Sequence, residues 1–280
     1  MPNWSLVCFT LMIQSAIGLV WVSIISRWFG GAERSHFFIW SMLTALILTG
    51  LGLIAALTHL SKPRLAPHAL RNLTASWLSR EILSVQAFAG ALLLSLFASL
   101  LESPALLALL EVAACLLGGA AMVTMIRVYL LKTVPEWNSS ATLLEFAGSA
   151  LLLGGALGGA FALLGTPHPL GWKTEFLTAG ISMLLGLILK LTAISPAVSA
   201  EEAAHTQTWY APSSTLVSVG RVLSIRIGLY LAGLTLTLIP VVMAKYGPAC
   251  LWAVLSLTCL GVGEVVGRRR FYQAYRRFGI

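Results

Sequence analysis

The sequence predicts an all-α integral membrane protein, a single bundle of eight transmembrane helices. Three observations lead to this fold class. Apolar residues make up 58% of the 280 residues and charged residues only 10%, whereas a soluble domain carries about 25% charge. The mean hydropathy is +0.88. The apolar residues also gather in long uninterrupted runs. Soluble enzymes, disordered chains and disulfide scaffolds are therefore excluded.

Eight apolar runs account for most of the chain. Each is long enough to cross the hydrocarbon core of a bilayer, which takes about 20 residues. The runs must be helical, because hydrocarbon offers no hydrogen-bond partner to free backbone groups. They cover approximately residues 6–26, 38–58, 83–101, 105–126, 141–165, 175–195, 218–242 and 247–266. We expect them to form one domain over residues 1–280.

Local features of several runs support their assignment in chain order. The first run follows no basic segment and ends in no small-residue cleavage site, so we interpret it as a retained span. Only Glu102-Ser103-Pro104 separates the third run from the fourth. The fifth run contains two overlapping GxxxG pairs within residues 154–159, which favour close helix packing inside the bundle. Longer connections occupy residues 59–82 and 196–217.

An even number of spans places both termini at one end of the bundle, which we call side A. Fourteen of the 18 Lys and Arg residues belong to side A or to the span ends nearest it. They are Lys62, Arg64, Arg71, Arg80, Arg127, Lys132, Lys190, Arg221, Arg226, Arg268, Arg269, Arg270, Arg276 and Arg277. Taken alone, this excess places side A in the cytoplasm. We attribute the net charge of +8 to phospholipid headgroups or a docking surface, and not to nucleic acid.

The connection between the second and third runs holds the clearest candidates for chemistry. His59 ends one apolar span, and Arg80 and Glu81 open the next. We expect these span ends to be neighbours, which brings an imidazole and a carboxylate together at the membrane boundary. Ionisable groups at that depth are candidates for proton transfer. The alternative is that His59 is an interfacial end residue and Glu81 an acid favoured by the helix dipole.

Other chemical groups are sparse. The cysteines lie apart and none has CxxC spacing, which argues against zinc or an iron–sulfur cluster in this protein. His36 and His59 stand at opposite ends of one run and the other histidines lie in loops, so the sequence offers no pair for a transmembrane haem. Glu111 and Glu145 lie in or beside spans. We expect them to form hydrogen bonds within the bundle, and the alternative is that either acid is a station for proton transfer.

Three segments resemble the membrane anchor subunit of dimethyl-sulfoxide reductase, the DmsC family. The first and most specific runs from His59-Leu60 through Pro63 and Asn72-Leu73 to Ser76-Trp77-Leu78-Ser79-Arg80-Glu81-Ile82. The second pairs Arg127-Val128-Tyr129 with Val134-Pro135-Glu136-Trp137-Asn138, and the third joins Glu264 to Gly267-Arg268 and Phe271-Tyr272. The resemblance extends over the whole length of the protein. Ser61 and Leu65 depart from the glycine and arginine usual in this family, and Arg64 is the arginine nearest to Leu65.

The resemblance implies an anchor in the bacterial inner membrane that oxidises menaquinol to menaquinone. This protein would be the quinol-oxidising subunit of an oxidoreductase complex, without haem or cluster of its own. Electrons would pass to a ferredoxin-like four-cluster iron–sulfur subunit and then to a molybdopterin catalytic subunit. The resemblance implies that His59 and Glu81 bind and oxidise the quinol. We add Arg64, Trp77 and Arg80 to the expected quinol-binding residues, since Arg64 or Arg80 can hold negative charge beside His59 and Glu81. The resemblance also suggests that side A faces the periplasm, against the charge count, so the orientation stays open.

Two other functions remain as alternatives. A secondary transporter would need charged residues near the midplane and a cavity open to water, and the central parts of the runs carry almost no charge. A purely structural anchor would tolerate replacement of both His59 and Glu81 without loss of electron transfer.

Overall fold

Eight long helices form the described part of the protein. The computed structural model describes residues 4–30, 36–58, 68, 70–101, 103–134, 136–164, 171–199, 214–242 and 249–273, and no strand occurs within them. The helices are α1 (Trp4–Gly30), α2 (His36–Thr58), α3 (Trp77–Leu100), α4 (Pro104–Tyr129), α5 (Ser140–Leu164), α6 (Gly171–Thr192), α8 (Ser214–Val242) and α9 (Ala249–Gln273). Each contains a segment long and apolar enough to cross a membrane. The predicted all-α fold with eight spans is confirmed.

Two helices extend well beyond the apolar runs that predicted them. Helix α3 begins at Trp77, six residues before the predicted start at 83, and Ser76 caps it by accepting a 3.2 Å hydrogen bond from the Ser79 amide. Helix α9 continues to Gln273, seven residues past the predicted end at 266. Hydropathy locates only the apolar part of a helix, whereas backbone hydrogen bonding continues into its polar ends. Both extensions lie at side A and carry candidate residues.

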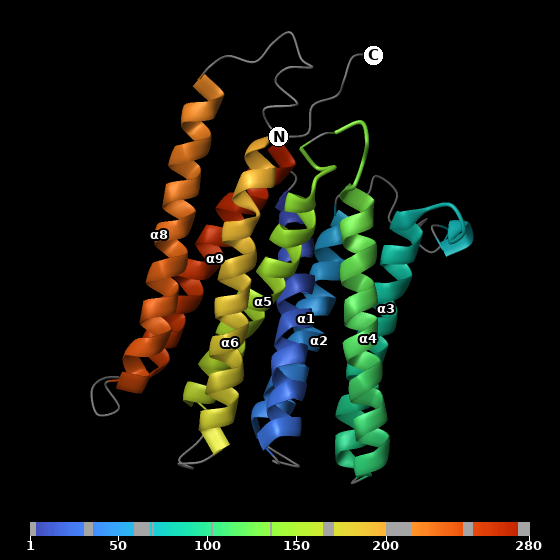
Figure 1. Cartoon of the computed structure of the whole chain (residues 1–280). Helices are drawn as coiled ribbons and strands as arrows, with labels where there is room; N and C mark the ends of the chain where they lie inside the picture. The colour runs from blue at the N-terminus through green and yellow to red at the C-terminus, as the bar shows by residue number, and fades with distance from the viewer. Residues whose placement is uncertain are drawn as a thin grey trace.

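The helices run up and down and bring the first and last of them together at side A, the upper end in Figure 1. The Arg269 guanidinium near the end of α9 lies 5.6 Å from the ring centroid of Trp4, the first residue of α1. Helices α3 and α4 pack together at one edge of the bundle, and α8 packs mainly on α9 at the other. Helices α1 and α5 lie between these pairs.

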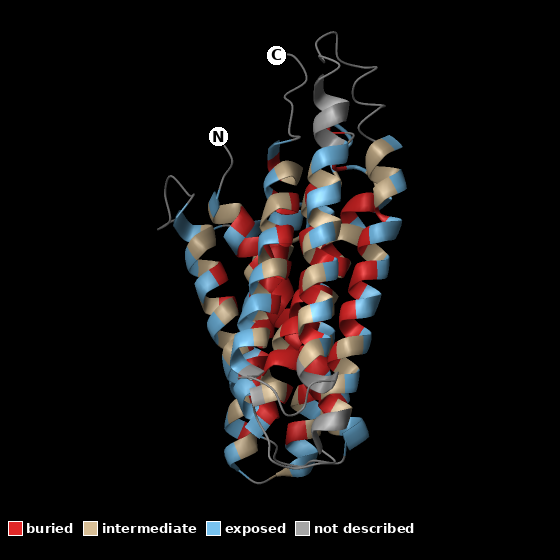
Figure 2. Ribbon diagram, turned by 90° about the vertical axis from the view of Figure 1, so that its left-hand side faces the viewer, coloured by how far each residue is buried: buried red, intermediate tan, exposed pale blue. Residues whose placement is uncertain are grey.

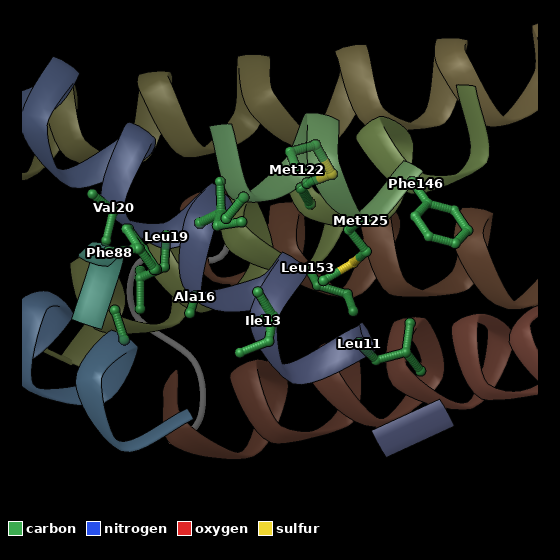
Figure 3. Close-up of a cluster of buried hydrophobic side chains, with 14 of the residues drawn as sticks. Leu11, Ile13, Ala16, Leu19, Val20, Phe88, Met122, Met125, Phe146 and Leu153 are labelled. Carbon is green, nitrogen blue, oxygen red and sulfur yellow. The ribbon is translucent and has the colours of Figure 1, made fainter. Parts of the chain in front are cut away.

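The core of the bundle is built around α1 and α5. Within their apolar segments 78% and 72% of the residues are buried, against at most 39% in any other helix. Buried residues accordingly concentrate at the centre of the bundle in Figure 2. Figure 3 shows Ile13 and Leu19 of α1 packed with Phe88 of α3 and Met122 of α4. The outer faces of the other helices remain apolar and exposed, as expected for surfaces covered by lipid.

Glycines allow α5 to approach both of its main neighbours closely. A Cβ atom added to Gly18 of α1 would collide with the backbone of Ala150, and one added to Gly154 would collide with the backbone of Gly18. On the other side of α5, a Cβ atom on Gly186 of α6 would lie 2.6 Å from the backbone nitrogen of Leu152. The packing role predicted for the glycines of the fifth run is confirmed.

This contact yields a stability prediction. We expect Gly154→Leu to separate α1 from α5 and to lower the free energy of unfolding by about 1–3 kcal/mol or more, the cost of overpacking a filled interior. Gly119→Leu in α4 is the matched control, because a Cβ atom at Gly119 meets no atom within 4 Å. Thermal unfolding of both purified variants in detergent measures the difference. Equal melting temperatures would show that the α1–α5 contact is not tight.

Candidate functional site

Glu81 is a buried acidic residue near the start of α3. Because the helix begins at Trp77, Glu81 is its fifth residue and lies beyond the positions where an acid caps the first turn. The residue is only 3% exposed, and its Oε1 atom has no hydrogen-bond partner within the described part of the protein. An unpaired buried carboxylate is costly. The geometry therefore argues against a simple helix-end role for Glu81.

Two arginines flank the indole of Trp77 just outside Glu81. The guanidinium carbon of Arg80 lies 4.3 Å from the ring centroid of Trp77, and that of Arg127, at the end of α4, lies 5.5 Å away. Arg80 is held in place by hydrogen bonds to the carbonyl oxygens of Leu73 at 2.8 Å and Thr74 at 2.6 Å. The half-exposed indole thus carries fixed positive charge over its ring.

Three of the five predicted site residues lie close together in the structure. Trp77, Arg80 and Glu81 lie together on the first turns of α3. His59 and Arg64 lie outside the described residues, so their relation to Glu81 stays a prediction. Helix α2 ends at Thr58, directly before His59, and it packs against α3. The expected neighbourhood of the second and third spans is therefore confirmed for the helices themselves.

Two tyrosines lie on the inner side of Glu81. Tyr129 of α4 and Tyr272 of α9 are both buried. The Tyr272 hydroxyl donates a 2.8 Å hydrogen bond to the Tyr129 hydroxyl, and the two rings meet at a centroid distance of 5.6 Å. The Thr10 hydroxyl of α1 lies 3.4 Å from the Tyr272 hydroxyl. These hydroxyl groups form a buried polar contact between α1, α4 and α9.

The second and third segments of the family resemblance meet around Tyr129. The Trp137 indole nitrogen donates a 2.8 Å hydrogen bond to the Phe271 carbonyl, and the two rings stack at a centroid distance of 5.2 Å. Trp137 also meets Tyr129 edge to face at 5.3 Å. Through the contact of Arg127 with Trp77, all three segments converge at side A. Sequence reasoning did not foresee this convergence, because nothing in linear order places residue 137 against residue 271.

A buried ionic cluster lies deeper, between α5, α6, α8 and α9. The Lys190 ammonium group lies 2.7 Å from Glu145 Oε2 and 3.0 Å from Glu264 Oε2, and it donates a 2.8 Å hydrogen bond to Ser149. Arg226 Nη2 lies 2.8 Å from Glu145 Oε2. Two cations thus neutralise two carboxylates. We call Lys190, Glu145, Glu264, Arg226 and Tyr230 the Lys190 cluster.

Tyr230 and a glycine complete this cluster. The Tyr230 hydroxyl donates a 2.9 Å hydrogen bond to Glu264 Oε1 and accepts one of 2.9 Å from Arg226. The Arg226 guanidinium lies close against Gly267 of α9, where a Cβ atom would be 2.5 Å from its Nη2 atom. The glycine that precedes Arg268 in the third family segment is therefore explained by this close approach.

Arg268 connects the Lys190 cluster to α1. Its Nη2 atom donates hydrogen bonds to Gln14 Oε1 at 2.6 Å and to Ser149 Oγ at 3.0 Å, and its guanidinium carbon lies 3.9 Å from the ring centroid of Phe146. Arg268 is only 4% exposed. Hydrogen bonds therefore extend from α1 through α9 and α5 to α6 and α8.

These contacts change how the charges of side A are counted. Lys190, Arg226 and Arg268 were assigned from the sequence to side A and its span ends, but they are held within the bundle by internal partners. Arg27, one of the four side-B cations, forms an ion pair with the fully buried Glu111. Buried and paired cations do not contribute to the charge of the loops. The excess of positive charge in the loops of side A is therefore smaller than the count of Lys and Arg in the sequence indicates.

The hydrogen-bonding role predicted for the two membrane acids is confirmed. Glu111 accepts a 3.0 Å hydrogen bond from the Trp28 indole in addition to its ion pair with Arg27. Glu145 is held by Lys190 and Arg226. In the described ranges, no three His, Cys, Asp or Glu side chains gather as a metal site would require.

Comparison of the sequence with known proteins identifies one family and several similar proteins. Residues 1–274 match the family described as DMSO reductase anchor subunit (DmsC). The sequence is 31% identical to the C subunit of the anaerobic dimethyl sulfoxide reductase of Escherichia coli, over 99% of its own length and 96% of that protein. It is 30% identical to the YnfH subunit of an anaerobic dimethyl sulfoxide reductase of the same organism over the same shares. The corresponding C subunit of Haemophilus influenzae is 31% identical over 57% of each protein.

Proposed function

The protein belongs to the DmsC family of DMSO reductase anchor subunits, and from that premise we propose that it binds menaquinol at side A and oxidises it. Membership makes it a multi-pass protein of the bacterial inner membrane. It also implies a catalytic reductase partner, which an anchor subunit holds at the membrane. The quinol site and the transfer of electrons to a partner subunit go beyond family membership, and they are the part that we propose.

Glu81 is buried and its Oε1 atom has no hydrogen-bond partner among the described residues, and this observation carries the proposal. Glu81 lies behind an indole face flanked by Arg80 and Arg127, at the end of the bundle where α2 leads into His59. A quinol ring needs an apolar flat surface, a base for its hydroxyl proton and a nearby positive charge. Trp77 would supply the apolar surface, His59 or Glu81 would supply the base, and Arg80 would supply the positive charge.

The chemistry follows from these assignments. Oxidation of menaquinol releases two hydroxyl protons and two electrons, and His59 accepts the protons one after the other, because neutral imidazole is a suitable base near neutral pH. Glu81 receives each proton and passes it toward side A. Arg80 and Arg64 stabilise the negative charge that deprotonation leaves on the ring oxygen. Electrons leave the ring for a ferredoxin-like iron–sulfur subunit outside the membrane, which supplies a molybdopterin catalytic subunit.

Binding of a menaquinone analogue to the purified protein tests the proposal. We expect saturable binding in isothermal titration calorimetry, and we expect Trp77→Leu to weaken it roughly two- to tenfold, the range for losing one aromatic contact. Trp40→Leu is the matched control, because Trp40 is an exposed indole near the start of α2, at the opposite end of the bundle. Absence of saturable binding, or equal weakening by both substitutions, would favour a purely structural anchor.

A further inference from the structure

A cavity of about 560 Å³ opens beside the Lys190 cluster at side A. Its walls come from the start of α5, the helical residues 194–199 that follow α6, the first described side chains of α8, and the end of α9. The quinol chemistry proposed above does not use this cavity. Glu81 and Trp77 do not line it. It therefore requires a separate explanation.

Positive charge dominates the cavity and its floor. Arg226 and the consecutive arginines 268–270 line it, together with Glu136, Glu145 and Glu264. With Lys190 beneath the cavity, five cationic side chains face three carboxylates. Glu145 and Glu264 are already neutralised by Lys190 and Arg226. Among the described lining residues, Arg268 and Arg269 therefore leave an excess of positive charge, which suits an anionic group and disfavours a cation.

The remaining wall of the cavity is apolar and continues toward the membrane interior. Ile194 and Val198 face Val222 and Leu223 of α8 across it. A separate void of about 10 Å³ between α6 and α8 has room for about one water molecule and is lined by charged as well as apolar side chains, among them Glu145, Lys190 and Arg226. The part that suits a hydrocarbon tail is therefore the apolar wall of the main cavity, and its basic part suits a charged head. Basic pockets between transmembrane helices bind anionic lipid headgroups in this way.

We propose that this cavity binds an anionic phospholipid. The phosphate would contact Arg269 and Arg270 at the mouth, with the paired Arg226 below it, and an acyl chain would lie along the apolar wall between α6 and α8. The lipid would cover the Lys190 cluster from the membrane side. This site is independent of the proposed quinol site.

Lipid-dependent stabilisation of the purified full-length protein tests the proposal. We expect phosphatidylglycerol to raise the melting temperature by several degrees more than phosphatidylethanolamine does at equal concentration, since a ligand at about 100 times its Kd stabilises by about 2.7 kcal/mol. The preference for phosphatidylglycerol should disappear in the double variant Arg269→Gln/Arg270→Gln. A control double variant, Arg71→Gln/Lys132→Gln, removes the same charge from exposed residues outside the cavity and should retain the preference.

A second variant distinguishes lipid binding in the cavity from a general effect of surface charge. Ala197→Trp should fill the apolar wall without changing any charge, and it should abolish the preference while leaving the unfolding temperature without lipid near that of wild type. Inorganic phosphate, tested alone, should not reproduce the effect. Equal stabilisation by phosphate would overturn the assignment to a lipid, and a preference that persists in both the arginine and the Ala197→Trp variants would overturn the assignment to this cavity.

Discussion

A His59→Arg variant should assemble in the membrane and lose about a hundredfold or more of its quinol-dependent turnover. Arginine keeps a polar, interfacial side chain after α2, but it stays protonated and cannot accept a proton from quinol. The expected loss is the usual scale for removing a general base. Turnover with a menaquinol analogue and the natural acceptor, measured on the purified complex, gives the result.

Glu81→Gln should reduce the same activity by a comparable factor. The amide keeps the shape of the carboxyl group inside α3 and its hydrogen-bonding capacity, but it cannot carry the proton. The Ser84 hydroxyl contacts the Glu81 backbone carbonyl and Thr124, not the carboxylate. Because no described group hydrogen-bonds Oε1, the substitution should leave the packing of α3 on α4 intact.

Two controls distinguish lost chemistry from lost assembly. His68→Arg introduces the same side chain at an exposed position of the same connection and should leave quinol turnover near wild type. Reduction of the partner subunits by an artificial dye bypasses the anchor and should survive in every variant. Wild-type quinol activity in an assembled His59→Arg complex would remove His59 from the mechanism. Loss of dye-driven activity would instead identify a folding role for His59 or Glu81.

The sequence predicted the fold because lipid imposes a single strong rule. Each long apolar run must be a helix, and the described helices agree with the runs to within a few residues at most ends. The largest departures, at Trp77 and Gln273, occur where polar residues continue a helix out of the apolar layer. That difference matters for Glu81, which hydropathy placed at a span boundary and the structure places inside α3.

The candidate site was predicted in part, through the resemblance of its first segment. Trp77, Arg80 and Glu81 are close in sequence, so a local motif was enough to group them. The polar contact between Tyr129 and Tyr272 joins residues 143 positions apart, which no local pattern shows. The same holds for the Lys190 cluster. Its members were counted singly as span-end charges or as isolated acids, and only the packing of four helices joins them. The single-domain organisation over residues 1–280 stays a prediction.

The Lys190 cluster leads to the second large expected effect. Lys190→Met should lower the free energy of unfolding by about 3–5 kcal/mol, the usual cost of removing one partner from a buried ion pair. Methionine preserves most of the side-chain volume beside Gly148, but Glu145 and Glu264 lose the ammonium group that bridges them. Glu145 keeps Arg226, whereas the partners that Glu264 keeps among the described residues are the Ser149 and Tyr230 hydroxyls. The buried charge of Glu264 therefore accounts for most of the expected cost.

A double variant tests whether the uncompensated buried charge of Glu264 causes this loss of stability. Lys190→Met/Glu264→Gln removes one charge of each sign and should recover at least half of the stability lost in Lys190→Met, because the amide can still bond to Ser149 and Tyr230. Lys132→Met, at an exposed position, should change the free energy of unfolding by less than about 0.5 kcal/mol. Thermal unfolding in detergent and the amount of protein in membranes measure all three variants. A double variant less stable than Lys190→Met would show that Glu264 is needed for its hydrogen bonds and not merely neutralised by Lys190.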